Sequence, residues 1–394
     1  MTRLAITDYT AASAIGVGRA PTLQALREGR SGLQRKHFET CTLDTWIGEV
    51  ADVDTQHLPE ELAAFDCRNN RLAWLGLQAD GFADSVASAR ERYGARRIGV
   101  FLGTSTSGIL NTEQAFRRRD PATGALPPDF RYAQTHSTAS VAAFVRRALQ
   151  LEGPSFVVST ACSSSAKAFG NAARLIELGV IDAAVVGGVD SLCMTILYGF
   201  NSLELLSADV CRPWDAERKG LSLGEGAAFA LLERDAARPR AWLLGVGESS
   251  DGHHMSSPHP EGAGAAEAMA GALAQAGLQP DAVDYLNLHG TATPNNDAAE
   301  DMAVRTVFGG RIPCSSTKGA TGHTLGAAGG VEAAISLLAL EHGVMPGGLN
   351  RRTPDPALQA NYLTQPRDAT LKAVASNSFG FGGSNACLVF GAAA

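Results

Sequence analysis

The stretch Ser159-Thr160-Ala161-Cys162-Ser163-Ser164-Ser165 follows an apolar run at residues 154–158 and precedes a small-residue segment at 166–178. The apolar run is typical of a buried strand, and the segment after the turn is typical of a helix. This order places the Cys162 thiol at a helix N-terminus, where unpaired N–H groups and the helix dipole favour the nucleophilic thiolate. We therefore expect Cys162 to be a catalytic nucleophile; the alternative is a buried structural cysteine.

The composition is that of an ordinary soluble globular protein, with 394 residues, 45% hydrophobic and 19% charged. A net charge of −7 gives no support to nucleic-acid binding. The seven cysteines form no C-x-x-C pair, and their odd number argues against a disulfide framework, so a reducing cytoplasm fits best. No stretch reaches the ~18 apolar residues of a membrane-spanning helix, and residues 1–7 resemble a first strand more than a signal peptide. We expect a cytoplasmic protein with no membrane or nucleic-acid partner.

Short β-branched runs alternate with segments rich in alanine and leucine, which predicts an α/β fold with buried sheets. The predicted strands are 97–103, 154–160, 183–190, 227–233, 242–248, 283–289, 312–316, 371–377 and 386–390. The predicted helices are 70–90, 140–151, 166–178, 263–276, 297–308 and 325–342. A weak break at 236–240 separates residues 1–238 from residues 239–394. Both parts contain a strand, a polar turn and a small-residue helix, and both end in a glycine-led strand, which predicts two similar halves packed as one unit.

His289 ends the apolar run 283–288 and begins the string His-Gly-Thr-Ala-Thr-Pro. The carboxyl ends of buried strands are where α/β proteins place their ligand sites. Gly290 permits a close backbone approach, and Thr291 and Thr293 offer hydroxyls on one side of an extended segment. The string predicts a ligand site, although a lone histidine at a strand end is often structural.

His323 lies in a second polar turn between a predicted strand and a small-residue helix. Lys318, five positions earlier, can lie beside this imidazole, and a nearby cation keeps a histidine neutral and able to donate an N–H hydrogen bond. Glu332 on the following helix can pair with Lys318. The alternative for Lys318 is an exposed loop charge.

A third turn, residues 377–385, carries three glycines around Phe379 and Phe381 and can bring backbone N–H groups close to a ligand. The residues favour this use over a phosphate-binding loop, because no Lys-Ser/Thr pair follows and no helix starts there. The alternative is an ordinary glycine-rich turn between two strands. Zinc ligands come in closely spaced pairs, whereas one cysteine and two histidines are scattered here, so we expect no metal. A cysteine protease leaves the second histidine unexplained, whereas stabilisation of an enolate oxygen explains both imidazoles.

Together these strings resemble the β-ketoacyl-acyl-carrier-protein synthases, of the elongating Cys-His-His type within the thiolase-like superfamily. The matching strings are residues 160–164, 212–215, 223–226, 289–294, 318–323 and 377–385, in the family's order. Chain-initiating synthases and chalcone-type enzymes carry Cys-His-Asn, and thiolases carry a second cysteine, so His323 argues against both. The resemblance implies a thiolase-like, five-layered αβαβα fold with two pseudo-symmetric halves.

The resemblance also implies a mechanism. Cys162 accepts an acyl group from acyl-carrier protein, the two histidines stabilise the enolate formed when malonyl-carrier protein loses CO₂, and no metal or redox cofactor takes part. The N–H groups of Cys162 and Phe381 form an oxyanion hole, and Phe381 gates the acyl pocket. The resemblance assigns catalytic roles to Cys162, His289, His323, Lys318 and Phe381, substrate contacts to Thr291, Thr293, Phe379, Gly380 and Thr106, and a supporting role to Glu332.

The implied partner is acidic acyl-carrier protein, for which Arg117-Arg118-Arg119, Arg68 and Arg71 are candidate contacts, unless they are ordinary solvated charges. A homodimer, or a heterodimer with a chain-length-factor-like subunit, is expected.

Thr106 lies in a hydroxyl-rich stretch where housekeeping enzymes tend to have a larger apolar residue. Residues 191–200 resemble ketosynthases of aryl-polyene pathways, so we expect a specialised, polyketide-like role. Two alternatives are a non-condensing, chain-length-controlling subunit, which would lack the active cysteine, and a coenzyme A-dependent thiolase.

Overall fold

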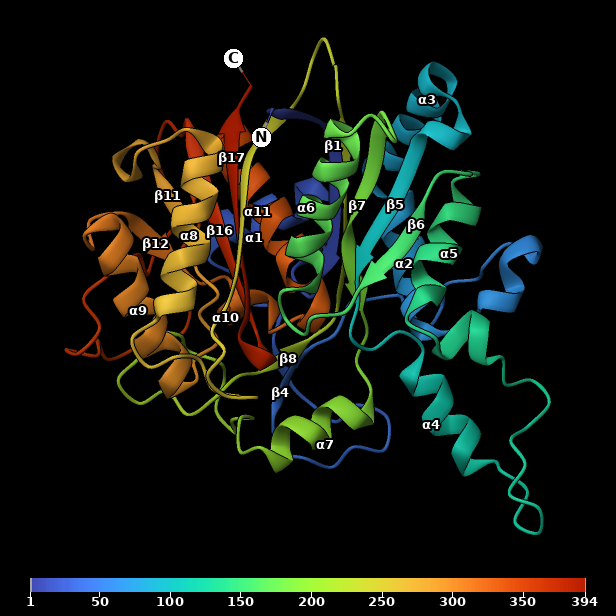
Figure 1. The fold of residues 1–394 in the computed structure, drawn as a ribbon. Coiled ribbons are helices and arrows are strands. Elements are labelled where there is room, and N and C mark those ends of the chain that lie inside the picture. The colour runs from blue at the N-terminus through green and yellow to red at the C-terminus, as the bar shows by residue number, and fades with distance from the viewer. Residues whose placement is uncertain (1, 394) are drawn as a thin grey trace.

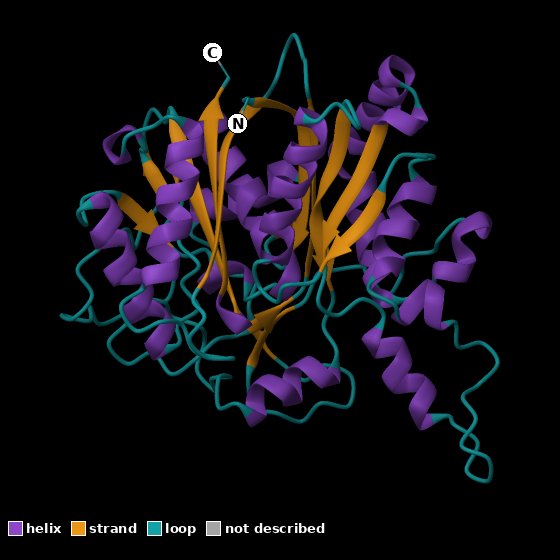
Figure 2. Cartoon of the chain, viewed as in Figure 1, coloured by secondary structure: helices purple, strands orange, loops and turns teal. Residues whose placement is uncertain are grey.

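In the computed structural model, which describes residues 2–393, two groups of strands stand side by side, with helices between them and on both outer faces (Figure 1). Helices α6 (Ser164–Glu177) and α11 (Ala328–His342) lie between the groups. Helices α8 (Ala263–Ala276) and α9 (Pro294–Phe308) cover one outer face. Helices α2 (Arg68–Gln78), α3 (Phe82–Tyr93) and α5 (Ala139–Ala148) cover the other. The predicted five-layered α/β architecture is confirmed, and Figure 2 shows the alternation of helix and strand layers.

The strands divide between the two halves of the chain. The first group runs β6 (Ser155–Val158), β5 (Ile98–Gly103), β7 (Ala183–Asp190), β9 (Gly226–Glu233) and β1 (Leu4–Ser13). The second runs β10 (Ala241–Ser250), β17 (Ser384–Ala392), β16 (Ala373–Gly380), β11 (Tyr285–Asn287), β12 (Pro313–Ser315) and β14 (Asn361–Tyr362). Antiparallel pairing of β1 with β10, with Leu4 opposite Leu243, joins the groups into one continuous sheet. Each group has a parallel part, so the carboxyl ends of β6 and β11 are natural places for a site.

Several short elements were not predicted. They include α1 (Arg19–Glu28), α4 (Ile109–Arg117), α7 (Met194–Ser202), α10 (Lys318–Thr321), β2 (Gly16–Val17), β3 (Gln34–Arg35), β4 (Trp46–Gly48), β8 (Leu223–Gly224), β13 (Val344–Met345) and β15 (Arg367–Asp368). There are also the 3-10 turns η1 (Glu60–Phe65), η2 (Ala79–Gly81), η3 (Ala95–Arg97), η5 (Pro280–Ala282), η6 (Leu325–Ala327) and η7 (Phe381–Gly383), and the π turn η4 (Tyr132–His136). Within residues 2–393, no helix combines the length and apolar character needed to cross a membrane.

The prediction of one helix over 70–90 is wrong. The chain breaks between α2 and α3, where Asp80 and Gly81 have φ values of 59° and 72°. The Asp80 carboxylate accepts hydrogen bonds from the Thr10 hydroxyl at 2.9 Å and from the backbone N–H of Arg19 at 2.8 Å. These hydrogen bonds hold the left-handed turn at Asp80. Thr10 and Arg19 lie far from it in the sequence, so the apolar pattern of residues 70–90 does not reveal the break.

The two central helices touch at their N-terminal ends. A Cβ atom on Gly329 of α11 would lie 2.7 Å from the backbone nitrogen of Ala166 and 2.9 Å from the Ser378 hydroxyl. Only a glycine fits this contact, because real Cβ atoms do not approach so closely. The contact brings the turn before α6 and the turn before α11 to one place, and Cys162 and His323 lie in those turns.

We predict that Gly329→Ala lowers the free energy of unfolding by about 1–3 kcal/mol, because the added methyl overpacks the helix contact. Gly271→Ala in the middle of α8 is the control, since its Cβ would meet only ordinary van der Waals contact at 3.6 Å. That control should keep or raise the stability by up to about 1 kcal/mol. Urea denaturation measures both values, and equal stabilities would contradict the proposed helix contact.

Candidate active site

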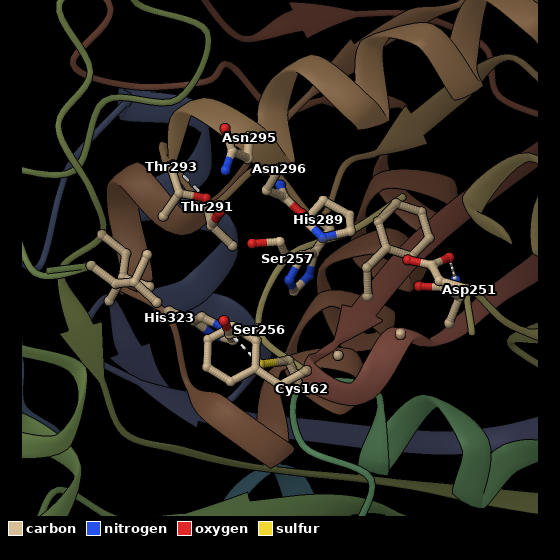
Figure 3. A pocket seen from close by; sticks show the side chains of 18 of the residues that line it. Cys162, Asp251, Ser256, Ser257, His289, Thr291, Thr293, Asn295, Asn296 and His323 are labelled. Carbon is tan, nitrogen blue, oxygen red and sulfur yellow. Dashed lines mark hydrogen bonds between the residues drawn. The ribbon is translucent and has the colours of Figure 1, made fainter. Parts of the chain in front are cut away.

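Cys162, His289 and His323 converge in one buried cluster (Figure 3). The sulfur and one nitrogen of each imidazole all lie within 4.8 Å of one another. Cys162 precedes α6, His289 follows β11, and His323 lies between α10 and α11. The side chains come from both halves of the chain and are 5%, 2% and 1% exposed. The structure thus brings together the three residues that the sequence singled out.

The turn carrying Cys162 is strained and tightly packed. Ala161 has a φ of 52°, a left-handed value that a residue with a side chain seldom adopts. Gly380 lies against this turn, where a Cβ atom would be 2.7 Å from the carbonyl oxygen of Thr160. The backbone N–H of Phe381 donates to the Cys162 sulfur, so the glycine-rich loop directs an N–H group at the reactive atom, as the sequence suggested.

The prediction of a thiolate at Cys162 needs correction. Burial raises the pKa of the Cys162 thiol to about 12, although the Lys318 charge and the Phe381 N–H group act in the opposite direction. The helix N-terminus is present, but desolvation of the charged form outweighs it. In the resting protein Cys162 is therefore a thiol, and its proton must leave in the step that uses the sulfur.

Hydrogen-bond partners determine the tautomer of each histidine. The Nδ1 atom of His323 accepts the backbone N–H of Leu325 at 3.1 Å, so the proton is on Nε2, which lies 3.0 Å from the Cys162 sulfur. The Nδ1 atom of His289 faces the Lys318 amine at 3.3 Å, and an ammonium group only donates, so His289 also carries its proton on Nε2. Both rings are thus N–H donors, and they lie in the same cluster as the Cys162 sulfur.

Burial keeps both imidazoles neutral. It lowers the pKa of His289 and of His323 well below the usual value, and the positive charge of Lys318 lowers both further. The sequence placed Lys318 beside His323, but its ammonium instead contacts Nδ1 and the backbone carbonyl of His289. Its effect on His323 acts through space. Lys318 also forms the predicted buried ion pair with Glu332, and burial raises the pKa of that carboxyl to about 7.

Sequence reasoning missed Glu300, which holds the turn that carries His289. Its carboxylate accepts the backbone N–H groups of His289 at 2.8 Å and Gly290 at 2.7 Å, and the Asn377 amide at 3.0 Å. Burial raises the pKa of Glu300 to about 7. The available signal was a pair of acidic residues three positions apart, Asp297 and Glu300, on a helix that starts directly after the histidine motif.

A cavity of about 180 Å³ opens onto Cys162 and both histidines. The predicted substrate contacts Thr291, Thr293, Phe379 and Gly380, together with Phe381, line it. Polar residues line other parts of its wall, and Figure 3 labels Asp251, Ser256, Ser257, Asn295 and Asn296 among them. The cavity therefore combines apolar and polar lining residues, as is usual for a site that binds a small organic ligand.

Two predicted contacts lie elsewhere. Thr106 does not line this cavity, because its hydroxyl and backbone N–H bind the buried Asp190 carboxylate at 2.8 and 2.9 Å. Arg68 is only 4% exposed and pairs with Glu225, so the prediction that it docks an acidic partner is wrong. The remaining candidates are on the surface: Arg71 is partly exposed and paired with Asp66, and Arg117, Arg118 and Arg119 are exposed.

A thiol and two imidazoles so close together also form a possible metal-ligand set. The protonation pattern opposes this use, because each Nε2 atom that faces the centre carries a proton and has no lone pair to give. To bind a cation through Nε2, each ring would have to move its proton to Nδ1. Each ring would then lose the hydrogen bond that its Nδ1 atom now accepts. The arrangement suits an oxygen that gains negative charge, which two convergent N–H donors stabilise.

Comparison with known proteins agrees with this geometry. The family description "Beta-ketoacyl synthase, N-terminal domain" matches residues 1–237, and "Beta-ketoacyl synthase, C-terminal domain" matches residues 240–352. The chain belongs to the β-ketoacyl synthase family. This ketosynthase is a thiolase-like condensing enzyme with a Cys-His-His triad.

Relatives and solved structures cover almost its whole length. It is 33% identical to the mitochondrial 3-oxoacyl-[acyl-carrier-protein] synthase of Arabidopsis thaliana, over 98% of this chain and 93% of that protein. It is 37% identical to nodulation protein E of Rhizobium meliloti strain 1021, over 98% of each chain. A structure of a ketosynthase in complex with its chain length factor, from Xenorhabdus doucetiae, matches with a TM-score of 0.90 and 37% identity, over 99% of this chain and 98% of that one.

We predict that nitrogen NMR of the labelled ketosynthase shows both active-site rings as neutral Nε2–H tautomers from about pH 8 down through 6.5. The neutral form is lost only when the pH falls through the lowered pKa of each ring. Spectra of His289→Ala and His323→Ala assign the signals. A ring that titrates at or above 6.5, or that carries its proton on Nδ1, would disprove the tautomer assignment.

Proposed function

We propose that this ketosynthase condenses malonyl-carrier protein with an acyl group held on Cys162, with loss of CO₂, and so extends a fatty-acyl or polyene chain by two carbons. The observation that carries the proposal is the pair of neutral Nε2–H donors beside one thiol. Two such donors stabilise the oxygen of a thioester enolate, the species that forms when a malonyl thioester loses CO₂.

In the first half-reaction the Cys162 sulfur attacks the thioester carbonyl of the acyl-carrier protein. A new carbon–sulfur bond forms, the bond to the carrier's sulfur breaks, and the thiol proton ends on the released carrier thiol. The exchange is therefore balanced without an external base. We expect the backbone N–H groups of Cys162 and Phe381 to receive the carbonyl oxygen as it gains negative charge. The hydrogen bond from the Phe381 N–H to the Cys162 sulfur supports this expectation.

In the second half-reaction malonyl-carrier protein enters the same cavity, with its phosphopantetheine arm along Thr291 and Thr293. The carbon–carbon bond to the carboxylate breaks, CO₂ leaves, and the electron pair moves onto the thioester oxygen between His289 and His323. The enolate carbon then attacks the acyl group on Cys162. The Cys162 sulfur leaves and takes a proton from water, which completes the 3-oxoacyl product.

We propose a specialised, polyketide-like pathway and a second subunit, either another copy or a chain-length-factor-like partner. The 37% identity to a chain from a ketosynthase–chain length factor complex supports this assignment. The exposed Arg117, Arg118 and Arg119 remain candidate contacts for the acidic carrier protein. The alternative, a chain-length-controlling subunit without condensing activity, gives no reason for the buried triad.

Incubation with acyl-carrier proteins bearing different acyl chains should add one acyl mass to the wild-type ketosynthase and none to Cys162→Ala, as intact-mass spectrometry measures. Ser163→Ala is the neighbouring control and should still acylate. An acyl adduct on Cys162→Ala would show that the nucleophile is another residue. A wild-type protein that never acylates would favour the chain-length-controlling role.

Replacing either histidine by alanine should slow CO₂ release from malonyl-carrier protein by about 100-fold or more, which corresponds to about 3 kcal/mol for one lost oxyanion donor. Cys162→Ala should still release CO₂, because this step does not use the sulfur. The rate should stay flat from about pH 8 to 6.5, because the pKa of each imidazole is lowered well below 6.5. A loss of rate centred at or above 6.5 would contradict the role of neutral imidazoles.

A further inference from the structure

Helix α7 receives its N-terminal cap from another helix. Cys193 stands at its N-cap position, and among the described residues the Cys193 side chain makes no capping hydrogen bond. The carboxylate of Glu113, on α4, takes this place. It accepts the backbone N–H of Thr195 at 2.6 Å, the Thr195 hydroxyl at 2.5 Å and the backbone N–H of Met194 at 3.1 Å. A negative charge at a helix N-terminus satisfies unpaired N–H groups and complements the helix dipole.

The last turn of α7 forms part of the active-site wall. The Phe200 ring stacks on the Phe381 ring, with centroids 5.6 Å apart and planes 23° apart. Both phenylalanines line the cavity that reaches Cys162. A displacement of α7 along or across its axis therefore moves the surface against which Phe381 rests.

Apart from this cap, α7 is held along one side. Met194 and Leu197 are its buried residues, and both pack in a cluster with Leu110 of α4. Tyr198 is 43% exposed and Leu203, directly after the helix, is 50% exposed, so much of its surface faces solvent. With only one buried side and nine residues, the helix depends on its cap for a defined start.

We infer that Glu113 is a positioning residue for acyl-chain selection: it caps α7 from α4 and thereby holds Phe200 against the Phe381 gate. The inference rests on the proposed function, since it concerns the acyl group that Cys162 accepts. Glu113 touches neither the substrate cavity nor the triad, so it acts through α7 alone. Loss of the Glu113 cap loosens the wall that Phe200 forms in the cavity beside Cys162. It leaves the two imidazole donors in place.

The test measures the rate of acyl transfer to Cys162 from carrier protein bearing a short or a long acyl chain, by intact-mass spectrometry. Glu113→Gln keeps the shape of the side chain and removes its charge. It should change the ratio of long-chain to short-chain kcat/KM by about threefold or more, in line with the energy of a helix cap. CO₂ release from malonyl-carrier protein, which needs only the imidazoles, should stay within about twofold of the wild-type rate. Gln114→Ala, one position further along α4, is the control and should leave the ratio unchanged.

Two further variants separate positioning from a general loss of structure. In a Phe200→Leu background, Glu113→Gln should have no additional effect on the ratio, because the residue that transmits the change is gone. Residue 193 has the extended backbone of an N-cap residue, so Cys193→Ser gives α7 a capping hydroxyl of its own. Added to Glu113→Gln, it should restore the wild-type ratio of long-chain to short-chain kcat/KM.

The outcomes are distinct. An unchanged ratio in Glu113→Gln would overturn the inference, as would an equal loss for both acyl lengths that Cys193→Ser does not rescue. Additive effects of the Phe200 and Glu113 changes would overturn it too. If the wild-type protein accepts no acyl group from any carrier, the proposed function fails instead.

Discussion

The close contact between the N-terminal ends of α6 and α11 is the constraint on which the rest of this structure depends. Gly329 permits it, since any larger residue would collide with the Ala166 backbone. Because Cys162 and His323 sit in the turns just before these helices, the contact places a sulfur from one half 3.0 Å from a nitrogen of the other. The active site is thus a consequence of how two helices cross in the middle layer.

Burial then determines the chemistry of the site. Desolvation disfavours the charged forms of the three triad side chains, so it raises the pKa of the Cys162 thiol and lowers the pKa of His289 and His323. The remaining charges occur as the Lys318–Glu332 pair, whose ammonium also binds the His289 backbone. The result is a resting site without a free thiolate, in which two neutral N–H donors wait for an oxygen that becomes negative.

Sequence patterns predicted most long elements well, because strands such as 183–190 and helices such as 263–276 carry their own apolar periodicity. They failed where a distant partner decides the local conformation. Asp80 interrupts the helix predicted over 70–90 because it binds Thr10 and the Arg19 backbone. Glu300 escaped notice for a related reason, since an acidic residue on a helix shows no role until that helix is placed against the strand end that carries His289.

The sequence by itself determined the residue types at the site, because the cysteine turn and the two histidine turns each carry their chemistry in a short local string. The tertiary structure decided which groups those residues meet and in which protonation state. Lys318 faces His289 instead of His323, Arg68 is buried in an ion pair, and the Cys162 thiol keeps its proton. These outcomes depend on burial and on contacts between segments far apart in the chain, and no local pattern of residues encodes either quantity.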